Sequence, residues 1–412
     1  MIIALALAPC AALAHQVSPL GPATVPVDPA TPADTLVGSA PPEAGQESSN
    51  RARKTYRPYQ HEPSVYFGAP PQRYNRVEGA VVGLQWPLLR TLRRNTPVRP
   101  FGQVGYALGL ERWRAIAGLE AWLVSGREAE GYGLKAGGHL ARTIASEDHW
   151  KRSWRDNALS AVLFGKDLYN YYGVRAATVY VVQRISSRLR VTVGGRWAEH
   201  RSLPRTIDGP PLAPNAFRPN PPIDGGEVRL GLLSVEAGRL TRRTETRPVG
   251  TVARLYAEWG RPWGAPLGYN RAVLHVQTRQ AVAAPLNVNV RGRVGWTSDD
   301  APVQTQFRLE GVRGLRTVQP VSRAEERLLL GGATLMWHDA PAPAWMRQAR
   351  LSTFADLGWA GERVLRNGQT FAFAGIGIDL FDQVLGIEIA WNLSPSTRPD
   401  WRPQASLSVN PF

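Results

Sequence analysis

The chain has 412 residues, of which 43% are hydrophobic and 20% charged, and its formal net charge is +16. This length accommodates one large domain or two medium ones. Most of the positive charge comes from arginines that stand singly along the chain, without the runs or helical stripe of a nucleic-acid-binding protein, so we expect no nucleic-acid partner. Beyond the N-terminus no segment has the long uncharged apolar run of a spanning helix, which argues against a helical membrane protein.

The N-terminus has the composition of an export signal. Residues 1–14 form an apolar run that contains the single cysteine, Cys10, and ends with an A-x-A site at Ala14. We therefore predict a signal peptide at 1–14, although the usual basic residues before it are missing, which suggests a truncated start. Pro9 argues against the alternative of a lipoprotein modified at Cys10. Cleavage would leave a mature chain without cysteine, which suits an exported protein.

The next residues change composition twice. Residues 15–50 are rich in Pro, Ala, Ser and Thr and contain no Lys or Arg, whereas residues 51–72 are basic and aromatic. The first stretch has too little apolar surface to offset the entropy of ordering, so we predict that 15–72 is a disordered Pro/Ala-rich segment followed by a basic N-terminal segment. Both stretches are too short, and lack the patterning, for a periplasmic substrate-binding domain.

From Tyr74 onward, stretches of ten to fifteen residues alternate apolar with small or polar residues, which is the period of a strand with two different faces. In residues 287–296 one face carries Val288, Val290, Val294 and Trp296, and the other carries Asn287, Asn289, Arg291 and Arg293. We predict sixteen strands, near 75–86, 100–111, 113–124, 132–145, 154–165, 171–183, 187–199, 226–237, 249–259, 268–281, 286–297, 326–338, 348–360, 370–381, 384–393 and 403–412.

The predicted connections fall into two classes. Those after odd-numbered strands are mostly long, such as 200–225 and 298–325, and those after even-numbered strands are mostly short, such as Glu111-Arg112 and 282–285. Long external loops and short periplasmic turns are typical of an outer-membrane barrel, whose strands are even in number. We therefore predict an all-β fold over 73–412, a 16-stranded antiparallel transmembrane β-barrel surrounded by the lipid of the bacterial outer membrane.

Aromatic residues near the predicted strand ends suit the two interfacial girdles of such a barrel, although aromatics also favour strands in general. They are Trp86, Trp113, Trp122, Trp150, Trp154, Tyr171, Tyr172, Trp197, Trp259, Trp263, Trp296, Trp337, Trp345, Trp359 and Trp391. The last strand ends at Phe412, and looks like the C-terminal signal by which the barrel assembly machinery recognises its substrates. We expect that machinery as a partner during biogenesis.

Two short motifs stand in related positions. Val312-Arg313-Gly314-Leu315 falls in the connection between the predicted strands eleven and twelve, the sixth external loop. Phe354-Ala355-Asp356-Leu357-Gly358 falls on the predicted strand thirteen. Together they resemble the superfamily of outer-membrane assembly factors and two-partner-secretion translocators (the bacterial surface antigen type of barrel), which carries V-R-G-[YF] and F-x-D-x-G there. The resemblance covers 74–412, and Leu315 departs from it by replacing an aromatic residue.

The resemblance implies that the sixth loop folds into the lumen and that Arg313 pairs with Asp356. Such a loop lock would consist of Val312, Arg313, Gly314, Phe354, Asp356 and Gly358. A guanidinium can grip a carboxylate with two charge-assisted hydrogen bonds in a restricted space. The alternative is that Arg313 is exposed and that Asp356 faces water without a partner.

No motif of a nucleophilic, metal-dependent or phosphate-binding site occurs in the chain, so we expect no enzyme, no catalytic residue, no cofactor and no metal. Three functions stay open. The resemblance implies a barrel similar to protein translocation or insertion factors, without periplasmic recruitment domains, that acts on a polypeptide client or with a separate periplasmic partner. The arginines favour a passive anion-preferring pore. The third is a membrane-anchored surface or structural barrel.

Overall fold

The computed structural model describes residues 73–86, 98–125, 132–150, 154–212, 216–242, 248–260, 265–283, 286–309, 324–337, 350–363, 366–380, 385–394 and 404–409. Its contacts divide the chain into two units, Met1–Asn50 and Arg51–Phe412, and every described residue belongs to the second unit. The predictions for residues 1–72, for the V-R-G motif at 312–314 and for Phe412 lie outside the described residues.

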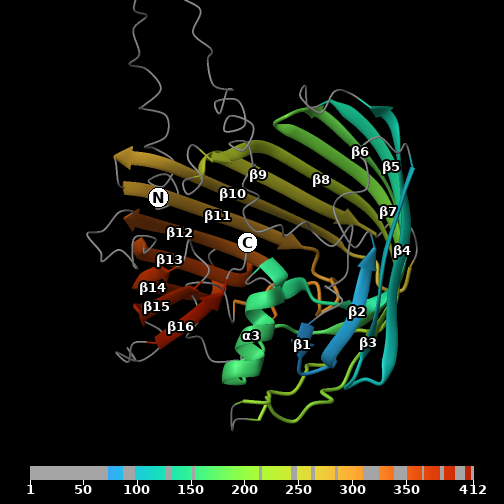
Figure 1. Ribbon diagram of the computed structural model, residues 1–412, viewed down its shortest axis with the longest axis horizontal. Coiled ribbons are helices and arrows are strands. Elements are labelled where there is room, and N and C mark those ends of the chain that lie inside the picture. The colour runs from blue at the N-terminus through green and yellow to red at the C-terminus, as the bar shows by residue number, and fades with distance from the viewer. Residues whose placement is uncertain are drawn as a thin grey trace, which may run out of the picture. The chain divides into compact units, whose positions relative to one another are not determined.

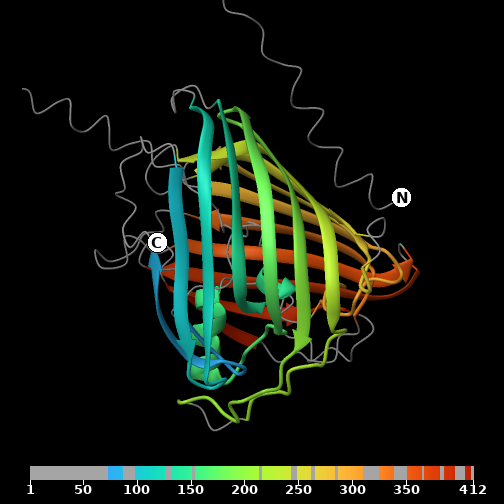
Figure 2. The ribbon, with the colours of Figure 1, turned by 90° about the vertical axis from the view of Figure 1, so that its right-hand side faces the viewer.

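The second unit is built on one antiparallel sheet, in which each strand pairs with the next in chain order. Figure 2 shows this sheet as a continuous curved wall. Its strands are β1 (Arg73–Asn75), β2 (Gly79–Trp86), β3 (Val98–Ala107), β4 (Arg112–Ser125), β5 (Gly133–Ala145), β6 (Tyr172–Ser186), β7 (Leu189–Ser202), β8 (Gly226–Arg242), β9 (Pro248–Trp259), β10 (Asn270–Ala283), β11 (Leu286–Thr297), β12 (Arg327–Trp337), β13 (Arg350–Arg363), β14 (Arg366–Leu380), β15 (Leu385–Asn392) and β16 (Gln404–Val409).

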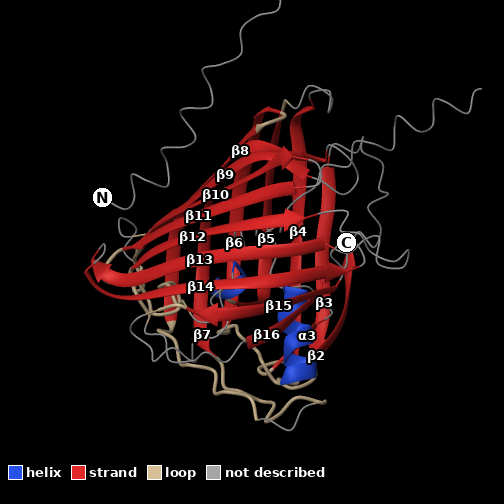
Figure 3. Cartoon of the chain, turned by 90° about the vertical axis from the view of Figure 1, so that its left-hand side faces the viewer, coloured by secondary structure: helices blue, strands red, loops and turns tan. Residues whose placement is uncertain are grey.

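The sheet has two edges that are not joined. In the described part of the chain β16 forms a ladder with β15, β1 forms one with β2, and no ladder connects β16 to β1 or β2. The helix α3 (Trp154–Phe164) lies next to both β1 and β16 (Figures 1 and 3). We call the opening between these two edge strands the seam. The predicted barrel is therefore present as a curled, all-β sheet that is not closed by strand pairing.

The two faces of the strands have opposite chemistry, as the alternation predicted. On β11, Val290 and Val294 are 43% and 49% exposed, whereas Asn287 and Asn289 are 4% and 8% exposed. A water-soluble sheet does the reverse, because it buries apolar side chains and exposes polar ones. An apolar outer face and a polar inner face are the pattern of a barrel surrounded by lipid. No helix among the described residues is long and apolar enough to span a membrane.

The predicted fifth strand, at 154–165, is wrong, because these residues form the helix α3. The buried residues Asn157, Ser160 and Ala161 have the i, i+3, i+4 spacing of one helix face. The helix ends at Gly165, which has φ of +64° and donates its N–H to the Ala161 carbonyl at 3.2 Å, a left-handed C-cap that favours glycine. The short helix η2 (Glu147–Trp150) precedes α3 in the same connection.

The predicted first strand, at 75–86, is interrupted by a turn at residues 76–78. The Asn75 side-chain oxygen accepts the N–H groups of Val77 and Glu78 at 2.9 and 2.8 Å, which bends the chain back at once. This break adds β1 to the sheet, while the helix α3 removes a predicted strand. The sixteen strands predicted from the sequence are therefore not the same set as those of the sheet.

The short turn at Glu111 was predicted to lie opposite the long loops, but it lies with them. Gly109 donates its N–H to the Glu78 carbonyl at 2.7 Å, and the Thr206 hydroxyl, in the connection between β7 and β8, bonds the Val77 carbonyl at 2.6 Å. We call this end, where the described residues of the connections after β5, β7 and β11 also lie, the loop end.

The aromatics of the predicted girdles differ in exposure. Trp113 and Trp337 are 65% and 49% exposed on the outer face, so the girdle prediction stays open for them. Tyr171, Tyr172 and Trp359 are at most 5% exposed, so they belong to the interior packing instead.

Candidate functional site

The inner wall carries an ion pair that spans three strands. Arg291 on β11 is in register with Gly332 on β12, and Gly332 is in register with Asp356 on β13. The Arg291 Nη2 atom donates to both carboxylate oxygens of Asp356, at 2.7 and 2.8 Å. Asp356 is 7% exposed, so its carboxylate is largely removed from water.

The pair depends on the glycine between its members. A Cβ atom added at Gly332 would lie 1.9 Å from the Asp356 Oδ1 atom and 2.9 Å from the Arg291 Nε atom. Any side chain there would therefore occupy the space through which Arg291 crosses β12. At the neighbouring Gly331, which faces the other side, an added Cβ meets nothing within 4 Å.

Two further residues of the predicted loop lock, Phe354 and Gly358, lie on β13 with Asp356. Phe354 is buried beside Asp356 on the same face, with its ring over Gly375, where a Cβ would approach to 2.3 Å. Gly358 is buried and in register with Leu330 and Phe371. The residues 312–314 lie outside the described part, so the pairing of Arg313 with Asp356 stays a prediction.

Arg291 is the partner that the sequence analysis missed. It had been assigned correctly to the polar face of its strand, but its contact with a residue two strands away was not foreseen. The signal was the pair Gly331-Gly332 in the next strand, because a glycine in a strand interior often marks the close approach of another group.

The connection between β11 and β12 begins by folding against the inner wall. Phe307 and Leu309 are each 1% exposed and belong to an apolar cluster with Leu328, Phe371 and Phe373. Phe307 exchanges two backbone hydrogen bonds with Glu325, at 2.8 and 2.9 Å, so both limbs of the connection are held there. The described limbs therefore cover part of the interior at the loop end, while residues 310–323 lie outside the described part.

A second charged group ties the loop end to the wall. Arg271 on β10 forms an ion pair with Glu147, from the connection before α3, and lies 3.9 Å from Glu258 on β9. The Tyr172 hydroxyl donates to Glu147 at 2.9 Å, and the Tyr269 hydroxyl donates to Glu258 at 3.0 Å. Burial and the nearby Glu258 carboxylate raise the pKa of Tyr269 well above its usual value, so this phenol remains a donor.

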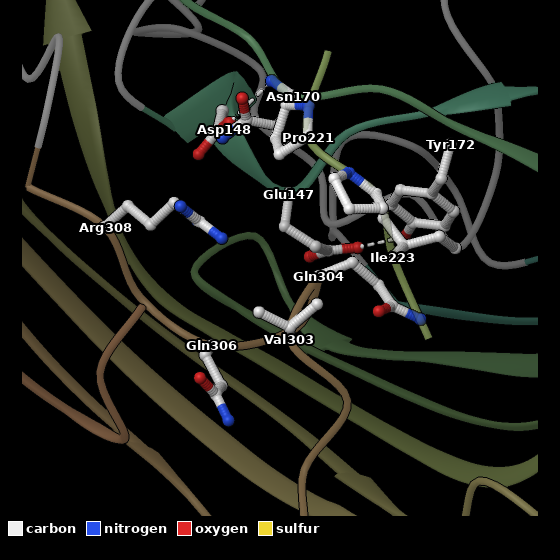
Figure 4. A pocket seen from close by; sticks show the side chains of 11 residues that line it. Glu147, Asp148, Asn170, Tyr172, Pro221, Ile223, Val303, Gln304, Gln306 and Arg308 are labelled. Carbon is white, nitrogen blue, oxygen red and sulfur yellow. Dashed lines mark hydrogen bonds between the residues drawn. The ribbon is translucent and has the colours of Figure 1, made fainter. Parts of the chain in front are cut away.

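A small pocket opens among these connections (Figure 4). It is lined by Glu147, Asp148, Asn170, Tyr172, Pro221, Pro222, Ile223, Val303, Gln304, Gln306 and Arg308. Its two acids are already bonded, Glu147 to Arg271 and Asp148 to the Asn170 N–H at 2.8 Å. In the described residues no group of three or more His, Cys, Asp or Glu side chains is placed to hold a metal ion.

The edge at β1 carries the most deeply buried charges. The carboxylate of Glu78 accepts Arg73 Nε at 2.6 Å, Asn75 Nδ2 at 3.0 Å and Arg114 Nη1 at 3.2 Å. Arg76, which is fully buried, bonds the Asp167 carboxylate through its backbone N–H at 2.9 Å and the Asp167 carbonyl through Nη1 at 2.8 Å. Burial lowers the pKa of Arg76, and Asp167 opposes that shift.

No protein-family model matches the chain, and a search of curated proteins found no significant match. Among solved structures, BamA from Haemophilus ducreyi lacking POTRA domains 1–3 matches 80% of this chain and 69% of its own, with 11% identity and a TM-score of 0.47. CdiB from Acinetobacter baumannii matches 76% of this chain, which spans 53% of CdiB, with 12% identity and a TM-score of 0.41. Identities and scores this low describe a distant likeness in fold and carry no information on activity.

Proposed function

We propose that this chain is a bacterial outer-membrane barrel that translocates or inserts polypeptide, and that the polypeptide engages the seam between β1–β2 and β16. The observation that supports this function is a sheet with a lipid-type outer face whose first and last strands share no ladder in the described residues. Lipid offers no hydrogen bonds to a strand edge, so an edge within the membrane favours a partner that completes it. An extended polypeptide can do so by adding a strand.

The lengths of the edge strands suit this function. β1 pairs with Gly79–Val81 only, although β2 continues to Trp86. β16 pairs with β15 over six residues, from Gln404 to Val409. The first edge is therefore formed by two short strands rather than by one that runs the full height of the wall. We also propose that this polypeptide is a client of the chain, and that a separate periplasmic protein can act as its partner.

In-cell photo-crosslinking tests this function, with one position at the seam and a matched position far from it. Val82 on β2 and Val179 on β6 are 64% and 66% exposed on the outer face, so each meets the surrounding lipid equally well. We expect a crosslinking residue at Val82 to trap polypeptide and the same residue at Val179 to trap none. Equal trapping at both positions, or none at Val82, would contradict the proposal.

The second candidate is the anion-preferring pore, and the observation in its favour is the cationic inner wall. Arg190 and Arg254 both form ion pairs with Glu236, so this cluster of three charged side chains has a net positive charge. A standing pore needs open space, however, and the packing of Phe307 and Leu309 against the wall favours the first function. A steady anion-selective current in planar bilayers would support the pore, and a closed baseline would oppose it.

A further inference from the structure

The helix α3 occupies an unusual place for a segment in the middle of the chain. It belongs to the connection between β5 and β6, yet it lies next to β1 and β16, the two edge strands that form the seam. Figure 1 shows α3 between these edges, and Figure 3 shows the same arrangement from the side. Eleven residues make a helix that is marginal by itself in water, so its neighbours must hold it there.

On the β1 side α3 is fastened by specific contacts. The guanidinium carbon of Arg73 lies 4.6 Å from the centre of the Trp154 ring, a cation–π contact between β1 and the first residue of the helix. The Trp154 ring also packs edge-on against Tyr169, at 4.8 Å between ring centres. These contacts tie the start of α3 to the edge strand and to the chain that follows the helix.

The second fastening is a carboxylate that α3 and the edge share. Asp167 follows the helix directly, because the turn at Gly165 brings the chain back alongside α3. Its Oδ1 atom accepts the Asn157 side-chain amide at 2.8 Å, and its Oδ2 atom accepts the Arg76 backbone N–H at 2.9 Å. One buried acid therefore joins the helix to the turn between β1 and β2.

On the β16 side the chemistry is different. In the described residues the backbone of β16 (Gln404–Val409) forms a ladder with β15 alone, so its other edge is paired with no strand. A helix has also used its backbone groups internally and cannot extend the ladder of β16. An incoming strand can form ladder hydrogen bonds with β16, which α3 cannot, so it can displace α3 from this edge.

We propose that α3 is a displaceable seal of the seam, which stays fastened to β1 and parts from β16 when the seam opens. The inference deepens the proposed function, since the seam is the same site. Its test needs no client, so its failure can be distinguished from failure of the crosslinking experiment at Val82.

The test loosens the fastening of α3 in the purified full chain in lipid bilayers. Trp154→Ala removes the ring contacts with Arg73, Tyr169 and Tyr171. Arg73→Lys is a milder variant that keeps a positive charge beside Glu78 but loses the planar group that stacks on the ring. Trp113→Ala is the matched control, because Trp113 is an exposed tryptophan on the outer face of β4. The readouts are hydrogen exchange of the peptide containing α3, and the frequency of current openings.

We expect Trp154→Ala to raise both the exchange rate of α3 and the opening frequency by roughly tenfold, the scale of one desolvated cation–π contact together with the lost packing. Arg73→Lys should shift both in the same direction by less, and Trp113→Ala should change neither. Crosslinking residues placed along α3 should reach the β16 peptide in the wild type and reach it less in Trp154→Ala. Faster exchange of α3 without more openings, or unchanged crosslinks to β16, would overturn the proposal.

Discussion

Breaking the pair between Arg291 and Asp356 should destabilise the sheet by more than a surface ion pair would. Asp356→Ala leaves the Arg291 guanidinium on the inner wall without the carboxylate that it contacts at 2.7 and 2.8 Å. Stranding one partner of a buried pair costs about 3–5 kcal/mol. The side chain of Arg291 is 27% exposed and that of Asp356 is 5% exposed, so water recovers part of the loss. We therefore expect Asp356→Ala to lower the free energy of unfolding by about 3 kcal/mol, the lower end of that range.

A double-mutant cycle isolates the pair from the packing of each side chain. The assay is urea unfolding of the full chain in lipid vesicles, followed by tryptophan fluorescence, for Asp356→Ala, Arg291→Ala and the double variant. The double variant should be less destabilised than the sum of the single variants by at least about 1 kcal/mol. If the two single-variant losses add up to the double-variant loss within about 0.5 kcal/mol, Arg291 and Asp356 do not stabilise each other, and the prediction is refuted. A larger loss for Asp356→Ala than for Arg291→Ala would indicate a further partner of Asp356, which is the role predicted for Arg313.

Three further predictions use the same unfolding assay. Gly332→Ala should lower the stability by an amount similar to loss of the pair, because the new methyl group overlaps the Asp356 carboxylate, whereas Gly331→Ala should be tolerated. Phe307→Ala should lower the free energy of unfolding by about 3–5 kcal/mol, because the ring is only 1% exposed. It should also make the connection before β12 accessible to protease. Unchanged protease resistance would contradict the packing role of Phe307. Burial, followed by the nearby Asp167 carboxylate, raises the pKa of Tyr171 well above its usual value. The stability it contributes is therefore present below pH 10 and is lost as the pH rises further, because the unfolded chain ionises first. The wild type should lose more stability than Tyr171→Phe between pH 9 and 11, and parallel curves would contradict this.

The strand faces were predictable from the sequence because the period of a strand is local. Val290 and Val294 had to share a face, and Asn289 and Arg291 had to share the other, whatever the rest of the chain did. The inner location of Asp356 was implied by the family resemblance and was not read from this period. The resemblance to a translocator-type barrel also came from local motifs, and the described strands form the expected all-β antiparallel sheet, although strand pairing does not close it.

The errors arose where a residue's environment is set by distant parts of the chain. Residues 154–165 contain Ala, Leu, Val and Phe, which suit a buried strand as well as a buried helix, and the cap at Gly165 was the decisive signal. The turn after Asn75 depends on a side-chain cap within a stretch that otherwise alternates. Arg291 reaches Asp356 only because Gly332 stands between them, and strand register cannot be read from one strand at a time.

The most direct test of the seam as the working site is the comparison of crosslinking at Val82 and Val179 in growing cells, with trapped material identified by mass spectrometry. The two valines differ little in exposure, at 64% and 66%, and differ in their distance along the sheet from the edge. We predict polypeptide adducts at Val82 and lipid alone at Val179. Lipid alone at both positions would show that no polypeptide uses this edge, and would contradict the proposed function.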